Sequence, residues 1–177
     1  MGSFSCDLAA AERALAVSPP EGTQGYLGFI VPREWYVGYT ARTFNRPEAA
    51  RAAFTATRAI VEKQLRDNPD NGLTWALLGE VKAAPGEKQE AIAAGQRACE
   101  LWPLSREPGW GLRTLRSLAI IYASVGEKDL ALQQLSSYAG QPSFVDYGEL
   151  KLNPDWDPLR GDPRFEKIVA SFAPKDR

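Results

Sequence analysis

The chemistry open to this chain is limited first by the absence of histidine from its sequence. Histidine is the usual general base near neutral pH and the commonest transition-metal ligand, so Ser-His and Cys-His catalytic pairs are excluded. Acid–base chemistry would fall to carboxylates, and the candidates are Glu62, Asp67, Glu80, Glu87, Glu90 and Glu100. Lysines and arginines are interleaved with them, as on a solvated helical surface. We therefore expect no catalytic residue and no metal site, and we interpret the protein as a non-enzyme.

Cysteine and phosphate-binding chemistry is equally sparse. Cys6 and Cys99 lie far apart and lack the close spacing of a metal knuckle or a redox motif. We interpret both as free thiols, with one bridge between them left open as the alternative. No Gly-rich phosphate loop or kinase catalytic loop is found, so we expect no cofactor.

Composition indicates an ordinary globular chain. Its 177 residues are 44% hydrophobic and 24% charged, which predicts a single domain over residues 1–177. Twenty-one basic and 22 acidic side chains give a net charge of -1, so no long-range field favours nucleic acid as a partner. No apolar run approaches the roughly 20 residues that span a bilayer, so we expect no membrane partner for this chain.

A repeated tripeptide reveals the organisation. Gly86-Glu87-Lys88 recurs as Gly126-Glu127-Lys128. The flanking positions also correspond: Trp75 with Leu115, Leu78 with Leu118, and Ala91 with Ala131. Repetition at this scale is typical of stacked supersecondary units, each of which buries its apolar face only against a neighbour.

Residues 72–105 form the clearest unit. Trp75 and Leu78 share one face of a first helix, a break follows at Pro85-Gly86, and Pro103 ends a second helix. Small residues stand where the two helices must approach closely, at Gly79, Ala91 and Ala98. The spacing predicts an antiparallel helix pair.

This order resembles the tetratricopeptide repeat, a 34-residue helix-turn-helix with the pattern Trp-x2-Leu-Gly-x2-Tyr, Ala, Phe, Pro. Two positions depart from that pattern. Lys82 stands where the family has Tyr, and Gly95 stands where it has a large aromatic residue. We expect the packing at these positions to be thinner, or to be filled from elsewhere.

The same pattern extends in both directions and predicts an all-α solenoid of antiparallel helix pairs with a C-terminal capping helix. The predicted segments are an N-terminal half-repeat helix over 7–18, repeat 1 over 32–69 with a long second helix, repeat 2 over 72–105, repeat 3 over 112–142 after a loop at 106–111, and a cap over 143–173. The half-repeat either caps the array or continues a protein that extends upstream. Residues 20–32 are turn-rich, and we expect them to be irregular, with Phe29 and Ile30 held in the core.

The predicted cap contains two Asp-Pro steps, Asp157-Pro158 and Asp162-Pro163. Each aspartate is suited to cap a helix whose first residue has no amide proton. Phe165 begins the apolar face of a last helix, and together with Trp156 it is suited to cover the end of the array. Arg160-Gly161-Asp162 spells an adhesion tripeptide, which we interpret as a loop and helix cap.

The stretch 152–165 gives the more specific resemblance. It is closely similar to the tail of the C-terminal tetratricopeptide region of large bacterial signalling proteins, where that region follows a serine/threonine kinase, a winged-helix regulator or a cyclase domain. The resemblance implies a regulatory, protein-binding module of a larger protein. Unpaired cysteines and the lack of an export signal make a cytoplasmic location the default. In relatives the repeats lie on either side of a membrane, so a periplasmic location is expected if the parent protein has an upstream membrane span.

In this family the first helix of each pair lines a concave groove, so its free positions face the ligand. The resemblance therefore selects Trp35, Tyr36, Tyr39 and Arg42 in repeat 1, Ala76, Glu80 and Ala83 in repeat 2, and Arg113, Arg116 and Ile120 in repeat 3. A groove that is aromatic at one end and basic at the other suits a peptide with a hydrophobic anchor and an acidic end. The alternative is that the three aromatic residues fill the core beside Phe29.

A second functional class is structural. Trp102 and Trp110 flank the predicted loop, and an exposed pair of tryptophans favours self-association of the parent protein. Burial of the two rings would instead make them part of the core.

Overall fold

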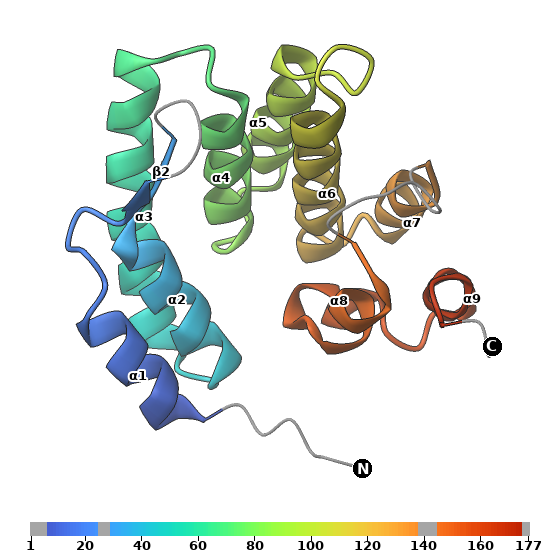
Figure 1. Ribbon diagram of the computed structural model, residues 1–177, viewed down its shortest axis with the longest axis horizontal. Helices are drawn as coiled ribbons and strands as arrows, with labels where there is room; N and C mark the ends of the chain where they lie inside the picture. The colour runs from blue at the N-terminus through green and yellow to red at the C-terminus, as the bar shows by residue number, and fades with distance from the viewer. Residues whose placement is uncertain (1–6, 25–28, 138–144, 175–177) are drawn as a thin grey trace. The chain divides into compact units, whose positions relative to one another are not determined.

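The computed structural model describes residues 7–24, 29–137 and 145–174 (Figure 1). These residues are mostly helical, which confirms the all-α class. A two-residue ladder, β1 (Thr23–Gln24) antiparallel to β2 (Ile30–Val31), replaces part of the irregular segment expected before Pro32. Phe29 is buried as predicted. Cys6 and the predicted helix stop at 140–142 lie outside the described residues, whose helices include none long and apolar enough to cross a membrane.

The chain divides into two compact units, Met1–Gln64 and Leu65–Arg177. The first holds α1 (Leu8–Ala16), α2 (Arg33–Thr43) and most of α3 (Pro47–Asp67). α1 begins at its cap residue Asp7, whose Oδ1 accepts a hydrogen bond from the amide of Ala9 at 3.0 Å. α3 runs for 21 residues and is the long second helix expected in repeat 1.

Three hairpin turns in the chain have the same backbone geometry. In each, a residue with positive φ is followed by an amide that donates to the carbonyl five positions before it, which closes the helix in the manner of a Schellman turn. The positive-φ residues are Asn45 (54°), Gly86 (87°) and Gly126 (83°), and the bonds are Arg46 N to Ala41 O (2.8 Å), Glu87 N to Lys82 O (3.1 Å) and Glu127 N to Tyr122 O (2.9 Å). Five positions after each positive-φ residue stands a buried alanine: Ala50, Ala91 or Ala131.

The second unit is built on two antiparallel helix pairs, α4 (Gly72–Ala83) with α5 (Lys88–Leu101) and α6 (Pro108–Ser124) with α7 (Lys128–Ser137) (Figure 1). α6 packs against both α4 and α5. Lys88 of the first repeated turn forms an ion pair with Glu127 of the second. Equivalent turns of successive pairs therefore lie side by side.

The start of α6 differs from the prediction. The segment 106–111 is expected to be a loop, but α6 already begins at Pro108. Proline suits the first turn of a helix because its missing amide proton would have no partner there. The Gly111 backbone lies directly against Leu104, where a Cβ would come within 2.7 Å of the leucine Cα, so this turn is packed against the preceding segment.

The two helix pairs approach each other at glycines. A Cβ on Gly79 would lie 2.5 Å from Ile121 Cδ1 and 3.0 Å from the Ala91 carbonyl oxygen. A Cβ on Gly95 would lie 2.8 Å from Ile121 Cδ1 and 2.9 Å from Leu118 Cδ1. The close helix approach expected at Gly79 is thus present. At Gly95, where the repeat pattern has a large aromatic residue, side chains of α6 fill the space instead.

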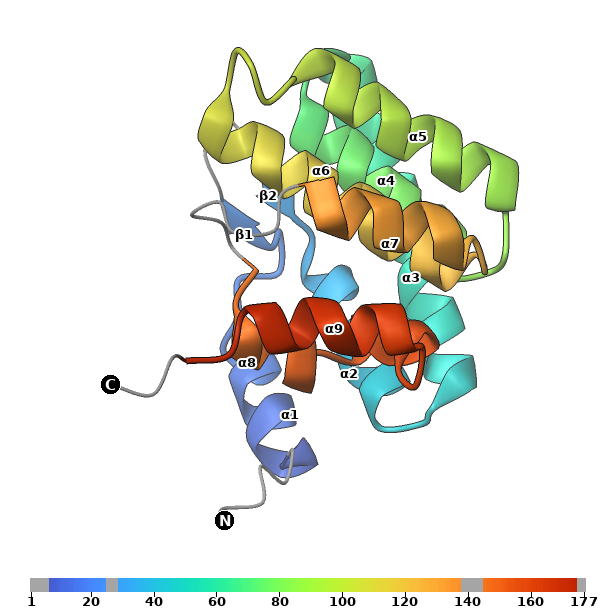
Figure 2. The same ribbon diagram turned by 90° about the vertical axis from the view of Figure 1, so that its right-hand side faces the viewer.

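The C-terminal segment consists of α8 (Tyr147–Leu152), the 3-10 helix η2 (Pro154–Leu159) and α9 (Pro163–Ser171), which we call the cap. Figure 2 shows α9 beside α8 and α7. Trp156 and Phe165 are fully buried, with ring centroids 6.5 Å apart, in one apolar cluster with residues of α6 and α7. The cap therefore belongs to the core of the second unit.

Only one of the two predicted Asp-Pro helix starts is correct. Asp162 caps α9, with Oδ1 accepting from the amide of Arg164 at 2.9 Å. Pro158 instead lies inside η2, which begins at Pro154 and is capped by Asn153. Asp157 therefore also lies within η2, and its Oδ1 accepts a hydrogen bond from Arg160 Nε at 2.6 Å. The remaining guanidinium nitrogens of Arg160 donate to backbone carbonyls of Leu150 and Asn153, which supports the loop-and-cap interpretation of Arg160-Gly161-Asp162.

Replacement of Gly79 by alanine should lower the free energy of unfolding by about 1–3 kcal/mol, the usual cost of overpacking, because the new methyl group meets a backbone oxygen as well as Ile121. The measurement is the urea midpoint. Gly109→Ala is the matched control: nothing lies within 4 Å of its Cβ position, and alanine in α6 should stabilise by about 0.5–1 kcal/mol. Equal midpoints for the two variants would contradict the packing argument.

Candidate functional site

The eight predicted binding residues fall into two groups, one in each unit. Trp35, Tyr36, Tyr39 and Arg42 lie on α2, and Glu80, Arg113, Arg116 and Ile120 lie on α4 and α6. Within each group the structure brings most of the predicted residues together. The two groups differ in chemistry, because the first is aromatic and the second is a network of charges.

On α2 the aromatic side chains form a stack. Trp35 and Tyr39 are one helical turn apart, and their rings are stacked with centroids at 5.2 Å. The Arg42 guanidinium lies over the Tyr39 ring at 4.9 Å from the centroid, and Tyr36 meets Trp35 edge-on at 5.1 Å. Each such ring contact contributes about 0.5–1.5 kcal/mol, so the geometry of the stack is held by its own members. We call these four residues the α2 stack.

The α2 stack lies beside the core of its unit rather than within it. The three aromatic side chains are half-buried and Arg42 is exposed, whereas Phe29 and Phe54 are buried. On the core side of the helix, Gly38 lets the Phe54 ring approach so closely that a Cβ would lie 2.8 Å from it. The stack thus combines the two roles weighed from sequence: part of each ring packs against the protein and part faces outward.

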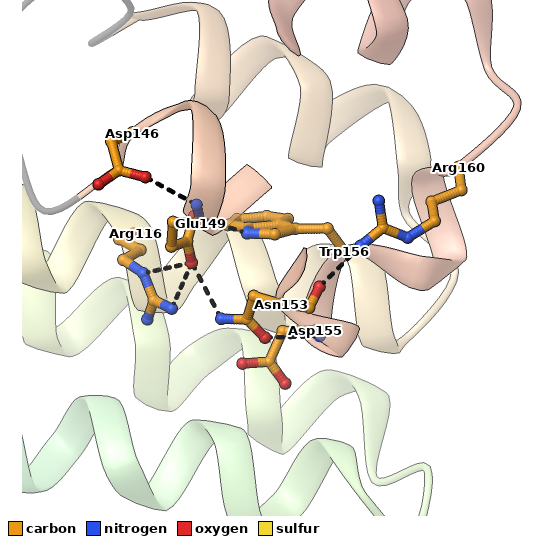
Figure 3. Close-up of polar contacts among 7 residues, drawn as sticks. All are labelled: Arg116, Asp146, Glu149, Asn153, Asp155, Trp156 and Arg160. Carbon is orange, nitrogen blue, oxygen red and sulfur yellow. Dashed lines mark hydrogen bonds and ion pairs between the residues drawn. The ribbon is translucent and has the colours of Figure 1, made fainter. Parts of the chain in front are cut away.

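In the second unit Arg116 is bound by the cap (Figure 3). Its Nη2 and Nε donate to Glu149 Oε1 at 2.6 and 3.1 Å, with side chains 22% and 16% exposed. Glu149 also accepts from Asn153 Nδ2 at 3.0 Å and from the Trp156 indole nitrogen at 2.9 Å. Burial lowers the pKa of Arg116, but the charges of Glu149 and Glu80 outweigh it and raise the pKa, so the guanidinium stays charged.

Glu80 lies at the edge of this network, on α4. Burial raises the pKa of Glu80, and the nearby Asp155 carboxylate raises it further. The charges of Arg116 and Arg113 and a hydrogen bond with Ser117 act in the opposite direction. The upward shift in pKa shows that these partners do not fully compensate the loss of water around the carboxylate.

The charges in this group correct the expectation of a basic groove end. Two arginines, Arg113 and Arg116, are accompanied by the carboxylates of Glu80, Glu149 and Asp155. Ile120, expected to face a ligand, is only 3% exposed and packs in the core cluster. Ala76 and Ala83 are buried as well. The cap therefore occupies part of the face that sequence reasoning left open.

Glu149, Asn153 and Trp156 were not among the predicted site residues. A local signal was present, because Asp146-x-x-Glu149 matches a helix capping box, and Asp146 Oδ1 does accept from the Glu149 amide at 2.7 Å. That signal fixes the start of α8. It carries no information about Arg116, which lies 33 positions earlier.

Two further groups have chemical potential. Trp102 and Trp110 lie with ring centroids 6.0 Å apart, both half-buried, and Trp102 packs over Gly72. The Cys99 thiol is a free cysteine whose pKa is raised by burial, so it is a poor nucleophile. Among the residues that the structure describes, no group of three or more Cys, Asp or Glu side chains is placed to hold a metal ion.

Comparison with known proteins identifies no family. No protein-family model matches the chain, and no curated protein matches it. The tetratricopeptide resemblance therefore rests on the residues quoted above and stays a prediction.

Breaking the Arg116–Glu149 pair should destabilise the protein more than breaking an exposed pair. We expect Arg116→Met and Glu149→Gln each to cost about 1–3 kcal/mol, because each leaves a partly buried charged group without its partner. In the double variant the two costs should not add, which gives a coupling energy of about 1–2 kcal/mol in urea denaturation.

The control cycle uses Arg97→Met and Glu100→Gln, an ion pair at 3.1 Å with side chains 46% and 65% exposed. Exposed pairs contribute about 0–1 kcal/mol, so this cycle should show little coupling. Equal coupling energies in the two cycles would mean that the cap does not depend on Arg116.

Proposed function

We propose that this protein is a non-catalytic scaffold that binds a protein or peptide segment on the first helices of its helix pairs, in the manner of a short tetratricopeptide array. The observation that carries this proposal is the α2 stack, in which Trp35, Tyr36 and Tyr39 are half-buried beside an exposed Arg42. Tryptophan, tyrosine and arginine are the residues most enriched at binding hot spots. Because their contacts with one another already order these side chains, binding would cost little additional conformational entropy.

Geometry also supports a repeat architecture. The three turns share one backbone conformation, and the turns of α4–α5 and α6–α7 are adjacent through Lys88 and Glu127. Stacked helix pairs typically present extended surfaces for partner segments. We further propose, from the resemblance of residues 152–165, that the protein is a regulatory module of a larger bacterial signalling protein, cytoplasmic unless its parent carries an upstream membrane span.

A catalytic function is less well supported. Glu80 is the best candidate for an acid, since a raised carboxylate pKa is common in active sites. Structural charge networks raise pKa values in the same way. Glu80 has Ser117 as its hydrogen-bond partner. Arg116, whose charge lowers the pKa of Glu80 more than that of Arg113, is itself bound by Glu149. We therefore interpret Glu80 as part of the network that joins the cap to α4 and α6.

The peptide-binding proposal can be tested by selecting 12-residue peptides from a random phage library on the immobilised full chain. Enriched peptides are resynthesised, and their affinities are measured by fluorescence anisotropy. We expect Tyr36→Ala to weaken binding at least about tenfold, which corresponds to about 1.4 kcal/mol. Arg113→Glu, on the exposed part of α6, reports whether the second unit takes part.

Arg106→Glu, an exposed substitution at a residue that belongs to neither group, is the control for charge, and circular dichroism checks that each variant is folded. Peptides that bind wild type, Tyr36→Ala and Arg113→Glu with equal affinity would rule out both groups as the binding surface.

The second candidate function is self-association of the parent protein through Trp102 and Trp110. The observation in its favour is that the two half-buried rings lie within 6.0 Å of each other, as one patch. If the patch joins two copies, Trp110→Ala should convert a dimer to a monomer in sedimentation equilibrium at micromolar concentration. A wild-type chain that is already monomeric would remove this candidate.

A further inference from the structure

Asn71 is followed by Gly72, and in an Asn-Gly step the backbone nitrogen can reach the side-chain amide with the least hindrance. Glycine has no Cβ to block the approach of its nitrogen or to restrict the turn that this approach requires. The chain has three other asparagines: Asn68 and Asn153 precede prolines, which have no amide proton to lose, and Asn45 precedes an arginine. Asn71–Gly72 is therefore the one Asn-Gly step in the sequence.

The reaction open to this step is intramolecular deamidation. The Gly72 nitrogen attacks Asn71 Cγ, the Cγ–Nδ2 bond breaks, and the proton of the attacking nitrogen passes through solvent to the departing group, which leaves as ammonia. The product is a cyclic succinimide. Water then adds to one of its two carbonyl carbons: cleavage of the nitrogen–Cγ bond gives aspartate, and cleavage of the original peptide bond gives isoaspartate, whose main chain runs through Cβ and Cγ. The sequence of steps consumes water only and changes no oxidation state.

Packing favours both residues of this step. A Cβ on Gly72 would lie 3.0 Å from Trp102 Cγ and 3.1 Å from the Ala98 carbonyl oxygen, so a side chain there would press on the tryptophan ring and on α5. Asn71 caps α4, with Oδ1 accepting from the Thr74 amide at 3.1 Å, and is only 4% exposed. The reactive pair is thus part of the packed start of α4.

The closed helix holds the reacting atoms apart. The ψ angle of Asn71 is 100°, which in an L-residue turns the Gly72 nitrogen to the side of the Cα–C bond away from Cβ and hence from Cγ. The capping bond directs the side-chain amide toward Thr74, and burial keeps water from it. Because an intramolecular attack needs its atoms close and aligned, the reaction requires the first turn of α4 to open.

We propose that Asn71–Gly72 is a deamidation site that is protected while α4 is closed and that makes the opening of α4 permanent. Isoaspartate lengthens the main chain by a carbon and shortens the side group by a carbon, so the Thr74 amide loses its cap. The first carbonyl of the helix is also displaced from the Trp75 amide, which donates to it at 3.2 Å in the closed state. Gly72 then no longer lies under Trp102. The inference does not depend on the proposed peptide binding.

The other product, aspartate, should be tolerated. Aspartate and asparagine are about equally good cap residues, and a negative charge is favourable beside the first turn of a helix. Asn71→Asp supplies this product directly. The variant therefore separates the effect of the new charge from the effect of the lengthened main chain.

The first test compares the rate of deamidation of the full chain in native buffer and in denaturing urea at the same mildly alkaline pH. Peptide mass spectrometry locates the mass gain that follows exchange of an amide for a carboxyl group. We expect Asn71 to react at least about a hundredfold faster in urea, because in the folded chain only the opened fraction reacts. Asn68 is the internal control and should stay unmodified in both conditions. Equal rates at Asn71 in the two conditions, or no reaction in urea, overturn the proposal.

The second test varies opening without changing the reacting pair. Gly79→Ala overpacks α4 against Ile121 and should speed the reaction in native buffer at least about threefold, by the same factor by which it speeds hydrogen exchange of the Trp75 amide. Gly109→Ala is the control and should not speed either process. If Gly79→Ala does not fold, wild type in urea below its midpoint gives the same comparison. A reaction rate that does not follow Trp75 exchange overturns the requirement for opening.

The third test addresses permanence. Chains that have reacted in urea are refolded by dilution and given a short pulse of protease, and electron-transfer fragmentation distinguishes isoaspartate from aspartate at position 71. We expect isoaspartate chains to be cleaved at least about threefold faster than aspartate chains, and the latter to match Asn71→Asp. Equal resistance of the two products would show that α4 closes again after modification, and it would overturn the permanent step.

Discussion

The second unit depends on the contact that brings the Ile121 side chain against two glycines, Gly79 on α4 and Gly95 on α5. At this point one helix pair meets the next at backbone atoms rather than at the tips of side chains. The contact fixes the position of α6, because even one added methyl group would have to displace it. α6 in turn carries Arg116 and the apolar residues on which the cap packs. The charge network is therefore positioned by van der Waals packing.

The apolar and charged contacts of the cap contribute in different ways. Trp156, Phe165, Leu150 and Leu159 are all fully buried, and each such side chain contributes about 1.5–3 kcal/mol relative to exposure. The Arg116–Glu149 pair loses hydration on burial and adds less net free energy. Its geometry nevertheless selects one orientation of α8, since Glu149 must also reach the Asn153 amide and the Trp156 indole. Apolar burial holds the cap in place, and the ion pair sets its register.

Sequence periodicity predicted the helix pairs well, because their determinants are local. Gly86 and Gly126 mark turns that need positive φ, and small residues at Gly79 and Ala91 mark the crossings. In the third turn Asn45 takes the place of glycine, which the Gly-Glu-Lys pattern alone would miss. The start of α6 at Pro108 was misjudged because the whole insertion 106–111 was interpreted as a loop, whereas proline also opens helices.

The site was harder to predict, because its partners come from distant segments. The α2 stack follows from helical spacing alone, as Trp35, Tyr39 and Arg42 recur on one face. Glu149 instead meets Arg116 only once the cap has folded over α6. The burial of Ile120 has the same origin. The repeat pattern assigns its position to an open groove, and nothing local in the sequence indicates that a later segment of the chain covers it.

Asp162 of the cap stands to the second repeated turn as Glu127 stands to the first. Lys88 in the first repeated turn bonds to the acidic residue of the second, and the equivalent Lys128 lies close enough to Asp162 to lower its pKa. The C-terminal segment thus supplies, in a different fold, the acid that another hairpin would have brought.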